Sequence, residues 1–465
     1  MFIPKPNPLI TIYITNYNYG KYIKESIESV LNQTCQDFEL IIIDDGSTDN
    51  SKEIINSYSN NEKIRIIFQN NKGLNITNNI ALRVARGKFI MRLDADDYLD
   101  SNALLVMSNI ISKDDELGLI FPDYFLVDAD GNVLSVAKRH SFDNNVSLLD
   151  QPAHGACTMI RKKFLQILGG YDEQFKCQDG YELWIKFTKK YKVTNVNTPL
   201  FYYRQHGLNL TSDERKILNT RASIKDKYIK KNGFKNMKSV AIIPVRGSKY
   251  KSNNVVFTKL NDKYVIDWKI DEALKSEKIS LVVVSSPDEK IEEHVLAKYG
   301  ENTKIKFHKR EEELARLNID LTQTINNILK QDYISEIDPQ ILVVLSVENP
   351  FVKSAFIDDA INSMNIFKTD SLISVRQETS MFFQHDGGGM KPILNQEKFS
   401  KLEREALYKY SGGIIAVKTS QFMKSLKLIS GTVGHIVIDE QSAHVLKTKY
   451  DVKIAQFLAK QEPEV

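Results

Sequence analysis

The sequence predicts an α/β protein made of two domains in tandem. Its 465 residues are too many for one ordinary core, since a domain averages about 150 residues. From Leu9 onward, short apolar runs alternate with stretches of helical periodicity, a pattern typical of βαβ units and a mostly parallel sheet. The alternation lapses near residues 230–238 and then begins again. We therefore expect one complete α/β domain in each half.

The first half divides into strands and helices by the spacing of its apolar residues. Short, continuous apolar runs predict strands at 9–14, 38–43, 64–68 and 89–93. Helical spacing predicts helices at 21–32, 50–58 and 74–85, and Gly87 follows the last of them. The sequence thus predicts three strand-helix units followed by a fourth strand.

A basic stretch containing Asn and Gly, residues 230–236, interrupts this pattern. Apolar runs at 239–244, 281–285, 341–345 and 372–375 follow it, separated by helical stretches. We therefore expect a first domain at 1–229, a linker at 230–238 and a second domain at 239–465.

Composition excludes several classes of protein. Hydrophobic residues make up 42% and charged residues 26%, so neither a disordered nor a collagen-like chain is expected. A net charge of +4 is too small at this length to indicate a nucleic-acid or membrane partner by itself. Cys35, Cys157 and Cys177 lack the spacing of a disulfide framework or a zinc site. With no apolar leader or membrane-spanning run, the expected location is the cytoplasm, with a peripheral position at the inner face of the membrane left open.

Carboxylates follow two of the predicted strands. Asp44 and Asp45 come directly after one, and Asp94, Asp96 and Asp97 come after another. Ligands of open α/β sheets bind beyond the carboxyl ends of the strands. Like charges repel there unless a cation lies between them, so the pattern favours a divalent cation bound with a diphosphate. For either cluster alone, turn formation and helix capping explain the residues equally well.

The first half closely resembles the family 2 glycosyltransferases, which have the GT-A fold. The resemblance covers about residues 8–215, with its blocks in the family's order and spacing, at 17–18, 22–34, 44–49, 71–74, 85–87, 92–97, 169–173 and 178–184. It implies a Rossmann-like nucleotide-diphospho-sugar transferase domain of GT-A type. Thr15, Asn16 and Asn78 depart from the family's pattern, and Asn78 stands where an Arg is common.

The resemblance also implies roles for individual residues. It places the nucleotide-sugar donor against Tyr17, Asn18, Asp44, Asp45, Lys72, Gly73, Arg92, Asp94 and Asp96. Asp94 and Asp96 form the family's Asp-x-Asp element for Mg²⁺ or Mn²⁺, and His206 belongs to an element that approaches the metal or the diphosphate. Asp179 matches the catalytic base, which takes the proton of the attacking hydroxyl. For Arg92, a phosphate contact and a structural ion pair remain equally open, and His206 remains open between the metal and a structural role.

Within 240–249 a strand runs into a loop with Arg, Gly, Ser and Lys, and further blocks stand at 282–286, 288–291, 309–310, 313–315 and 411–415. In these blocks the second half resembles the cytidylyltransferases that make CMP-activated acidic sugars. The likeness spans about 238–460 and implies a second domain of the same GT-A type, with Arg246, Ser248 and Lys249 in a loop suited to phosphates. The family's closing pair of metal-binding aspartates aligns with Val445 and Lys447. Neither side chain can bind Mg²⁺, which requires oxygen ligands, so we expect a domain that kept the fold and lost the reaction. It then serves as a nucleotide or sugar binder, a homodimer contact or a glycan-positioning module.

The expected function is an inverting, metal-dependent glycosyltransferase of surface polysaccharide synthesis. The expected partners are a nucleotide-diphosphate sugar, a UDP-sugar first, and a glycan or lipid-linked acceptor, without nucleic acid. Two alternatives stay open. One is a bifunctional enzyme that also makes a CMP-sugar, and the other is a non-catalytic glycan-binding scaffold. Asp94, Asp96 and Asp179 argue against the scaffold, while Val445 and Lys447 argue against the bifunctional enzyme.

Overall fold

A computed structural model describes residues 7–137, 155–206, 213–247, 255–378, 380, 382–385, 387–393 and 407–461 of the chain. It divides into two compact units. The first contains Met1–Asp213 and Phe383–Arg404, and the second contains Glu214–Phe382 and Glu405–Val465. No helix in the described part of the chain is long and apolar enough to cross a membrane.

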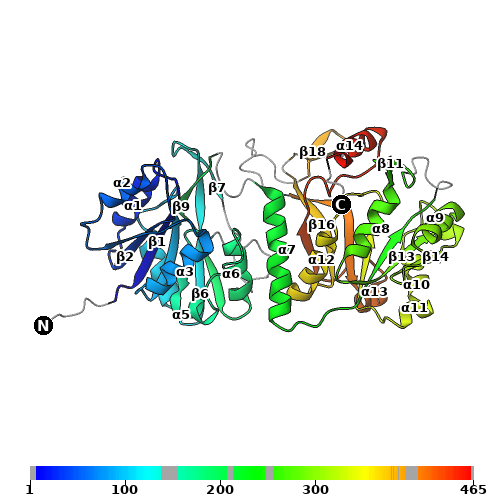
Figure 1. Cartoon of the computed structure of the whole chain (residues 1–465), viewed down its shortest axis with the longest axis horizontal. Coiled ribbons are helices and arrows are strands. Elements are labelled where there is room, and N and C mark those ends of the chain that lie inside the picture. The colour runs from blue at the N-terminus through cyan, green and yellow to red at the C-terminus, as the bar shows by residue number, and fades with distance from the viewer. Residues whose placement is uncertain are drawn as a thin grey trace. The chain divides into compact units, whose positions relative to one another are not determined.

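The first unit alternates strands and helices along its length (Figure 1). Its elements are β1 (Ile10–Asn16), α1 (Ile23–Leu31), β2 (Phe38–Asp44), α2 (Ser51–Asn56), β3 (Ile64–Phe68), α3 (Leu74–Val84), β4 (Phe89–Asp94), β5 (Tyr98–Leu99), α4 (Ala103–Ser112), β6 (Leu117–Val127), β7 (Val133–Ala137), β8 (Met159–Arg161), α5 (Lys162–Ile167), α6 (Asp179–Thr188) and β9 (Lys192–Arg204), followed by the separate hairpin β17 (Phe383–His385) and β18 (Met390–Pro392).

The sheet of the first unit is mixed, which corrects the expectation of a mostly parallel sheet. Its described strands run in the order β3-β2-β1-β4-β8-β6-β9-β5, with β7 paired to β6. The first four strands are parallel, as expected, but β8 pairs antiparallel with both β4 and β6. The direction of the later strands depends on the connections that lead into them. No local apolar pattern encodes this direction, so the sequence could not reveal it.

Side-chain alternation along the parallel strands produces two apolar cores, one on each face of this sheet. Ile12, Ile14 and Ile42 pack with α1, α2 and α4, whereas Ile41 and Ile43 pack with α3, α5 and α6. The strands β1, β2 and β4 are therefore covered on both faces, and only their ends are left to form a site.

The second unit begins with a helix rather than with a linker. Its elements are α7 (Glu214–Lys231), β10 (Ser239–Pro244), β11 (Lys259–Leu260), β12 (Lys263–Tyr264), α8 (Val265–Lys275), β13 (Ile279–Ser286), α9 (Glu289–Tyr299), β14 (Ile305–Lys309), the 3₁₀ helix η2 (Glu312–Ala315), α10 (Thr322–Leu329), α11 (Asp332–Ser335), β15 (Ile341–Leu345), α12 (Ser354–Phe367), β16 (Ser371–Glu378), β19 (Leu407–Lys418), α13 (Thr419–Ser425), β20 (Val433–Val437) and α14 (Lys449–Ala459).

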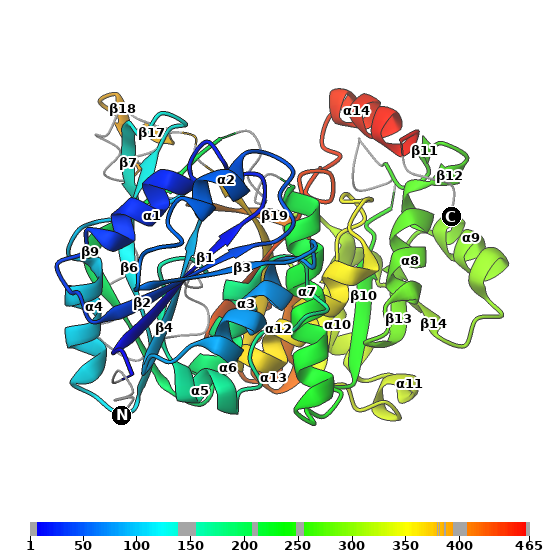
Figure 2. The same ribbon diagram turned by 60° about the vertical axis from the view of Figure 1, so that its left-hand side comes forward.

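The second sheet is also mixed and is covered on both faces (Figure 2). Its described strands run in the order β14-β13-β10-β15-β19-β16-β20, and β19 is antiparallel to both of its neighbours. Helices α8, α9 and α12 share one core with the strands, and α10, α11 and α13 share the other. The two units are thus separate α/β domains with the same layered plan.

Helix α7 is anchored inside the second unit by a buried ion pair. The Lys225 ammonium lies 2.6 Å from a carboxylate oxygen of Asp359 on α12 and donates to Ser363 Oγ at 2.9 Å. Both charged side chains are less than a tenth exposed. The division into compact units therefore differs from the expected boundary at 229, because it places this helix with the second domain.

Candidate functional site

Parallel pairing brings four polar side chains to one edge of the first sheet. In the strand register, Asn16 is opposite Asp44 and Thr15 is opposite Asp94. Asn16 Nδ2 donates to Asp44 Oδ2 at 2.8 Å, and Thr15 Oγ1 donates to Asp94 Oδ1 at 3.3 Å. The strand-end residues that the sequence singled out, Asp44 and Asp94, therefore lie on either side of β1.

Asp45 ties the second strand to the start of helix α3. Its carboxylate accepts the backbone N–H groups of Lys72 and Gly73, both at 2.8 Å, and the side chain of Gln69 at 2.7 Å. Gly73 has a φ of 88°, a conformation that favours glycine. The predicted residues Asp45, Lys72 and Gly73 thus come together, while the Lys72 side chain stays exposed.

The loop after β1 projects an aromatic ring into solvent. Tyr17 is 47% exposed, and Asn18 next to it has a positive φ of 61°. Asn18 is fixed there because its N–H donates to Ser47 Oγ at 2.9 Å and its Oδ1 accepts the N–H of Thr48 at 2.7 Å. This arrangement leaves the Tyr17 ring free to stack on a planar group such as a base.

Arg92 joins the two carboxylates that matter most for the predicted chemistry. Its guanidinium forms an ion pair with Asp179 and lies 2.9 Å from Asp94 Oδ1. The Arg92 side chain is only 4% exposed, and although burial favours its neutral form, Asp179 and Asp94 raise the pKa of its guanidinium. Of the two interpretations open for Arg92, the contacts here are those of an ion pair.

Asp179 begins helix α6 and is embedded in a buried polar network. The preceding residue, Gln178, is in the left-handed region, which turns the chain so that Asp179 faces the sheet. Asn78 Nδ2 lies 3.5 Å from Asp179 Oδ2, and Asn78 Oδ1 accepts from the Tyr13 hydroxyl at 3.2 Å. Asn78, noted in the sequence only as a departure from the family, therefore supports the candidate base.

Gly155 packs directly against this ion pair. A Cβ atom at this position would lie 2.6 Å from a terminal nitrogen of Arg92 and 3.0 Å from Asp179 Oδ2. No real Cβ tolerates such distances, so a side chain here has to displace one partner of the pair. Sequence reasoning did not single out Gly155, because the close approach depends on the folded chain.

Asp96 and His206 form a second pair of side chains in the candidate site. His206 Nε2 lies 2.9 Å from Asp96 Oδ2, and the His206 ring stacks on Tyr22 with ring centroids 5.5 Å apart. Burial, together with the negative charge of Asp94, raises the pKa of the Asp96 carboxyl. The structure thus brings His206, which follows β9, into contact with Asp96.

Arg204 holds the Asp-x-Asp turn in place, which sequence reasoning did not foresee. This fully buried side chain donates from Nε to the carbonyl of Asp96 at 2.9 Å, and its backbone N–H donates to Asp97 Oδ1 at 2.9 Å. Its guanidinium also lies 4.8 Å from the centre of the Tyr22 ring. Arg204 belongs to the same Tyr-Arg-x-His element as His206, which the resemblance identified, but its inward orientation is a tertiary feature that the resemblance did not predict.

The acidic side chains fit a divalent cation only in part. Asp97 Oδ2 is buried and has no hydrogen-bond partner in the described part of the chain, and burial followed by Asp96 and Asp94 raises the pKa of Asp97 well above its usual value. Among the described residues, no three acidic, His or Cys side chains form a group that could hold a metal ion by themselves. In proteins, Mg²⁺ is commonly bound through one or two carboxylates and completed by substrate phosphates.

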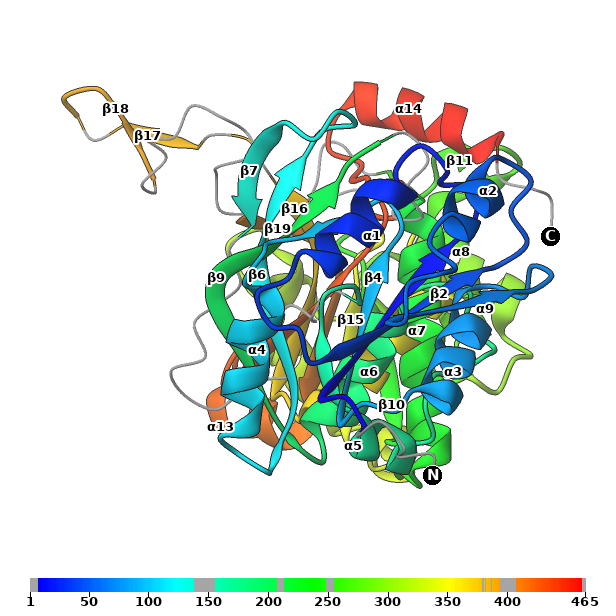
Figure 3. The same cartoon turned by 90° about the vertical axis from the view of Figure 1, so that its left-hand side faces the viewer.

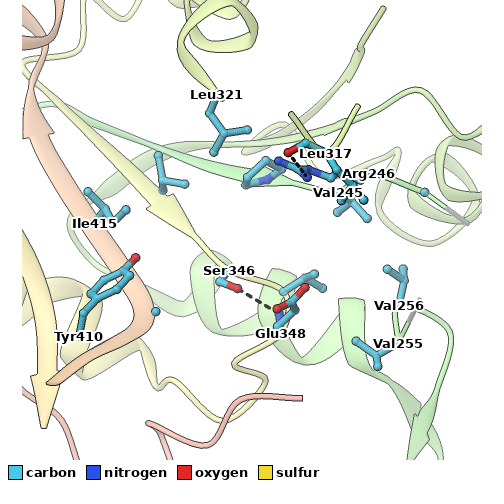
Figure 4. Close-up of a pocket in the computed structure, with 15 residues that line it drawn as sticks. Val245, Arg246, Val255, Val256, Leu317, Leu321, Ser346, Glu348, Tyr410 and Ile415 are labelled. Atoms are coloured by element: carbon cyan, nitrogen blue, oxygen red, sulfur yellow. Dashed lines mark hydrogen bonds between the residues drawn. The ribbon is translucent and has the colours of Figure 1, made fainter. Parts of the chain in front are cut away.

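A pocket of about 350 Å³ opens at the strand ends of the second unit (Figure 4). Apolar side chains, among them Val255, Val256, Leu321 and Ile415, make up most of its wall, and Ser346, Glu348 and Tyr410 supply polar atoms. The backbone N–H of Glu348 donates to Ser346 Oγ at 3.2 Å. The pocket is large enough for a small organic ligand.

Arg246 lines this pocket, but its guanidinium is engaged by the protein itself. It donates to the backbone carbonyls of Leu317 at 3.4 Å and Ile319 at 3.3 Å. The other two residues of the expected phosphate loop, Ser248 and Lys249, lie outside the described residues. At the expected metal position, Lys447 is exposed, and its backbone N–H donates to Asp451, which caps α14.

A second arginine near Arg246 is buried, and no ion pair joins it to an acidic side chain among the described residues. Arg310, after β14, is 2% exposed and donates to Ser285 Oγ and the Ser285 carbonyl at 3.3 and 3.1 Å. Its Nη1 has no hydrogen-bond partner among the described residues. Burial and the charge of Arg246 lower the pKa of Arg310 to about 10. Two arginine side chains, Arg246 and Arg310, therefore lie close to one another at these strand ends.

Comparison with known proteins assigns both domains. Residues 11–168 match the family described as glycosyl transferase family 2, and residues 240–387 match the cytidylyltransferase family. An uncharacterized glycosyltransferase of Methanocaldococcus jannaschii is 32% identical over 207 residues, 42% of this chain and 71% of that protein. The chain belongs to glycosyl transferase family 2, and it carries a cytidylyltransferase domain after the family 2 domain.

Two further relatives are much longer than the shared region. Chondroitin synthase of Escherichia coli is 31% identical over 203 residues, 43% of this chain and 30% of that enzyme. Hyaluronan synthase of Pasteurella multocida is 30% identical over 203 residues, 43% of this chain and 21% of that enzyme. The chain thus spans less than a third of either relative. A crystal structure of S. aureus TarS in complex with UDP-GlcNAc is 19% identical, has a TM-score of 0.40, and covers 47% of this chain and 66% of that one.

Proposed function

We propose that the first unit is an inverting, metal-dependent glycosyltransferase that moves a sugar from a nucleotide-diphosphate donor to a glycan or lipid-linked acceptor. The observation that carries the proposal is the buried bridge in which Arg92 joins Asp179 to Asp94. It supports a candidate base and a candidate metal ligand held at a fixed separation on one sheet edge. The names of the relatives from Escherichia coli and Pasteurella multocida support a glycan as the product.

In this proposal the chain's own residues perform most of the steps. Tyr17 stacks on the nucleobase, and Asp45 fixes the turn at Lys72 and Gly73 beneath the nucleoside. Asp94 and Asp96 would hold the cation, which would supply positive charge to the departing diphosphate. Asp179, paired with the Arg92 guanidinium, accepts the proton of the acceptor hydroxyl as that oxygen attacks the anomeric carbon from the face opposite the leaving diphosphate.

The test is a panel of sugar nucleotides, beginning with UDP-sugars, incubated with Mn²⁺ and glycan acceptors. Replacing Asp179 by Asn is expected to lower turnover by about 10²- to 10⁴-fold and to leave donor binding unchanged. Asp115→Asn is the matched control, because that side chain is 90% exposed in the same unit. Transfer that survives chelation of the metal contradicts the metal requirement, and normal turnover by Asp179→Asn removes this residue from the role of base.

For the second unit, we propose ligand binding without cytidylyl transfer. The engagement of Arg246 by two backbone carbonyls and the exposed Lys447 at the expected metal position support this assignment. The measurement is pyrophosphate release from CTP in the presence of acidic sugars and Mg²⁺. Sustained release would instead support the bifunctional enzyme.

A further inference from the structure

Helix α14 has an exposed apolar stripe on the side opposite its buried face. Ala455 and Ala459 are buried, and Val452 and Leu458 pack against the core of the second unit. Tyr450, Ile454 and Phe457 are nevertheless 76%, 49% and 62% exposed. Their spacing of four and three residues places them in one row along the helix.

The helix is firmly attached to its domain, so this stripe does not result from a detached terminus. Thr448 and Asp451 form a reciprocal capping box at its start. Near its end, Asn261 Nδ2 donates to the carbonyl of Ala459 at 2.6 Å, next to β11. Figure 3 shows α14 beside β11 at the surface. The stripe is therefore held outward by the fold.

Lysine side chains flank the stripe. Lys449, Lys453 and Lys460 are exposed, and at 100° per residue all three fall on the same flank of the helix, beside the apolar row. Lys447 is also exposed just before the helix. The one carboxylate within this segment, Asp451, is occupied by the capping box. The described segment 447–461 thus combines an apolar row with a net positive charge.

We propose that α14 lies on an anionic phospholipid surface, with Tyr450, Ile454 and Phe457 inserted among the acyl chains and the lysines at the headgroups. Aromatic side chains favour this interface, and lysines extend their charges toward water and phosphate while their stems stay in apolar surroundings. The positive charge of the lysines on this flank of α14 favours anionic over neutral lipid.

A second copy of the chain fits this surface less well. The three side chains expose roughly 400 Å² together, whereas a stable protein interface buries about 800 Å² on each partner. A two-fold contact through the stripe would also bring two sets of lysines close to one another. Both arguments favour the lipid surface.

The experiment is sedimentation of the full chain with vesicles of phosphatidylcholine, with and without phosphatidylglycerol. Wild type is expected to bind the anionic vesicles and to be released by high salt. The double variant Ile454→Ser/Phe457→Ser should bind at least tenfold more weakly. Leu296→Ser on α9 is the matched control, since Leu296 is 53% exposed in the same unit, and it should bind as wild type does.

A second variant keeps the proposal testable if the first fails to fold. Lys449→Gln/Lys453→Gln is expected to weaken binding to anionic vesicles by about fivefold for each lysine and to leave any binding to neutral vesicles unchanged. The proposal is overturned if wild type does not sediment with anionic vesicles, or if both double variants bind as tightly as wild type. It is also overturned if the apolar variant converts a dimer to a monomer without any change in lipid binding. None of these readouts depends on sugar transfer, so they are independent of the proposed function.

Discussion

Lys269 on α8 is expected to destabilise the second unit at neutral pH, and its replacement by Met should make the protein more stable. The side chain is fully buried, and its ammonium nitrogen has no hydrogen-bond partner in the described part of the chain. Burial, with only partial compensation by Glu272, lowers the pKa of Lys269 from 10.5 to about 7. Met has a similar length and shape and carries no charge, so it removes the cost without opening a cavity.

The size and the pH dependence of the effect follow from this shift. The unfolded chain stays protonated at Lys269 up to about pH 10.5, whereas the folded chain loses the proton near pH 7. Between these values unfolding takes up a proton, so the stability of wild type rises with pH. The free energy of unfolding of wild type should therefore be lower than that of Lys269→Met by about 4 kcal/mol at pH 7 and by about 2 kcal/mol at pH 9.

Urea unfolding followed by tryptophan fluorescence measures this directly. The chain has two tryptophans, Trp184 in the first unit and Trp268 next to Lys269, so a Trp184→Phe background reports on the second unit alone. Lys290→Met on the exposed surface of α9 is the control and should change little. The reasoning is refuted if Lys269→Met is no more stable at pH 7, or if the difference from wild type does not narrow toward pH 9.

Three further changes test other parts of the molecule. Gly155→Ala, which forces a methyl group against the candidate base and its ion-pair partner, should lower turnover by about ten- to a hundredfold with unchanged folding, measured by kinetics and circular dichroism. Lys225→Met leaves the Asp359 carboxylate buried and unpaired, so urea unfolding of the second unit should show a loss of about 3–5 kcal/mol. Pyrophosphate at a hundredfold its Kd should stabilise the second unit by about 2.7 kcal/mol without Mg²⁺, and Arg310→Met should remove this protection, measured by thermal unfolding. Normal turnover by Gly155→Ala would contradict the first prediction, and unchanged stability of Lys225→Met would contradict the second. Protection of Arg310→Met by pyrophosphate would contradict the third.

Strands that are buried along their whole length could be predicted closely from the sequence. The run expected at 64–68 is β3 without any change of boundary, although this edge strand exposes Arg65 and Phe68. The runs expected at 239–244 and 341–345 are β10 and β15, also without change, and these two strands are buried along almost their whole length. Such strands are continuous apolar runs because both of their faces are covered. The expected strand at 9–14 instead extends to Asn16, because polar Thr15 and Asn16 continue the pairing into the site.

The sequence predicted the site residues that directly follow a strand. It did not predict those that reach the site from distant parts of the chain. Asp44 and Asp94 were found because the carboxyl ends of adjacent parallel strands meet. The roles of Arg204 and Gly155 were not predicted, since the burial of an arginine and a close backbone approach depend on distant segments. The later antiparallel strands escaped prediction for the same reason, because their direction is decided by long connections.

The two units share a layered plan but differ in the charge that collects at the strand ends. In the first unit, Asp94, Asp96 and Asp97 crowd together, and burial and mutual repulsion raise the pKa values of Asp96 and Asp97. An edge of this kind is stabilised by a cation, and a diphosphate can follow the cation. In the second unit, Arg246 and Arg310 follow β10 and β14, and burial and the charge of Arg246 lower the pKa of Arg310. An anion stabilises that edge directly, because no cation is needed between the anion and the arginines. Under the function proposed for the second unit, the arginines would account for binding of a phosphate-bearing ligand, whereas nucleotide transfer would require acidic metal ligands as well.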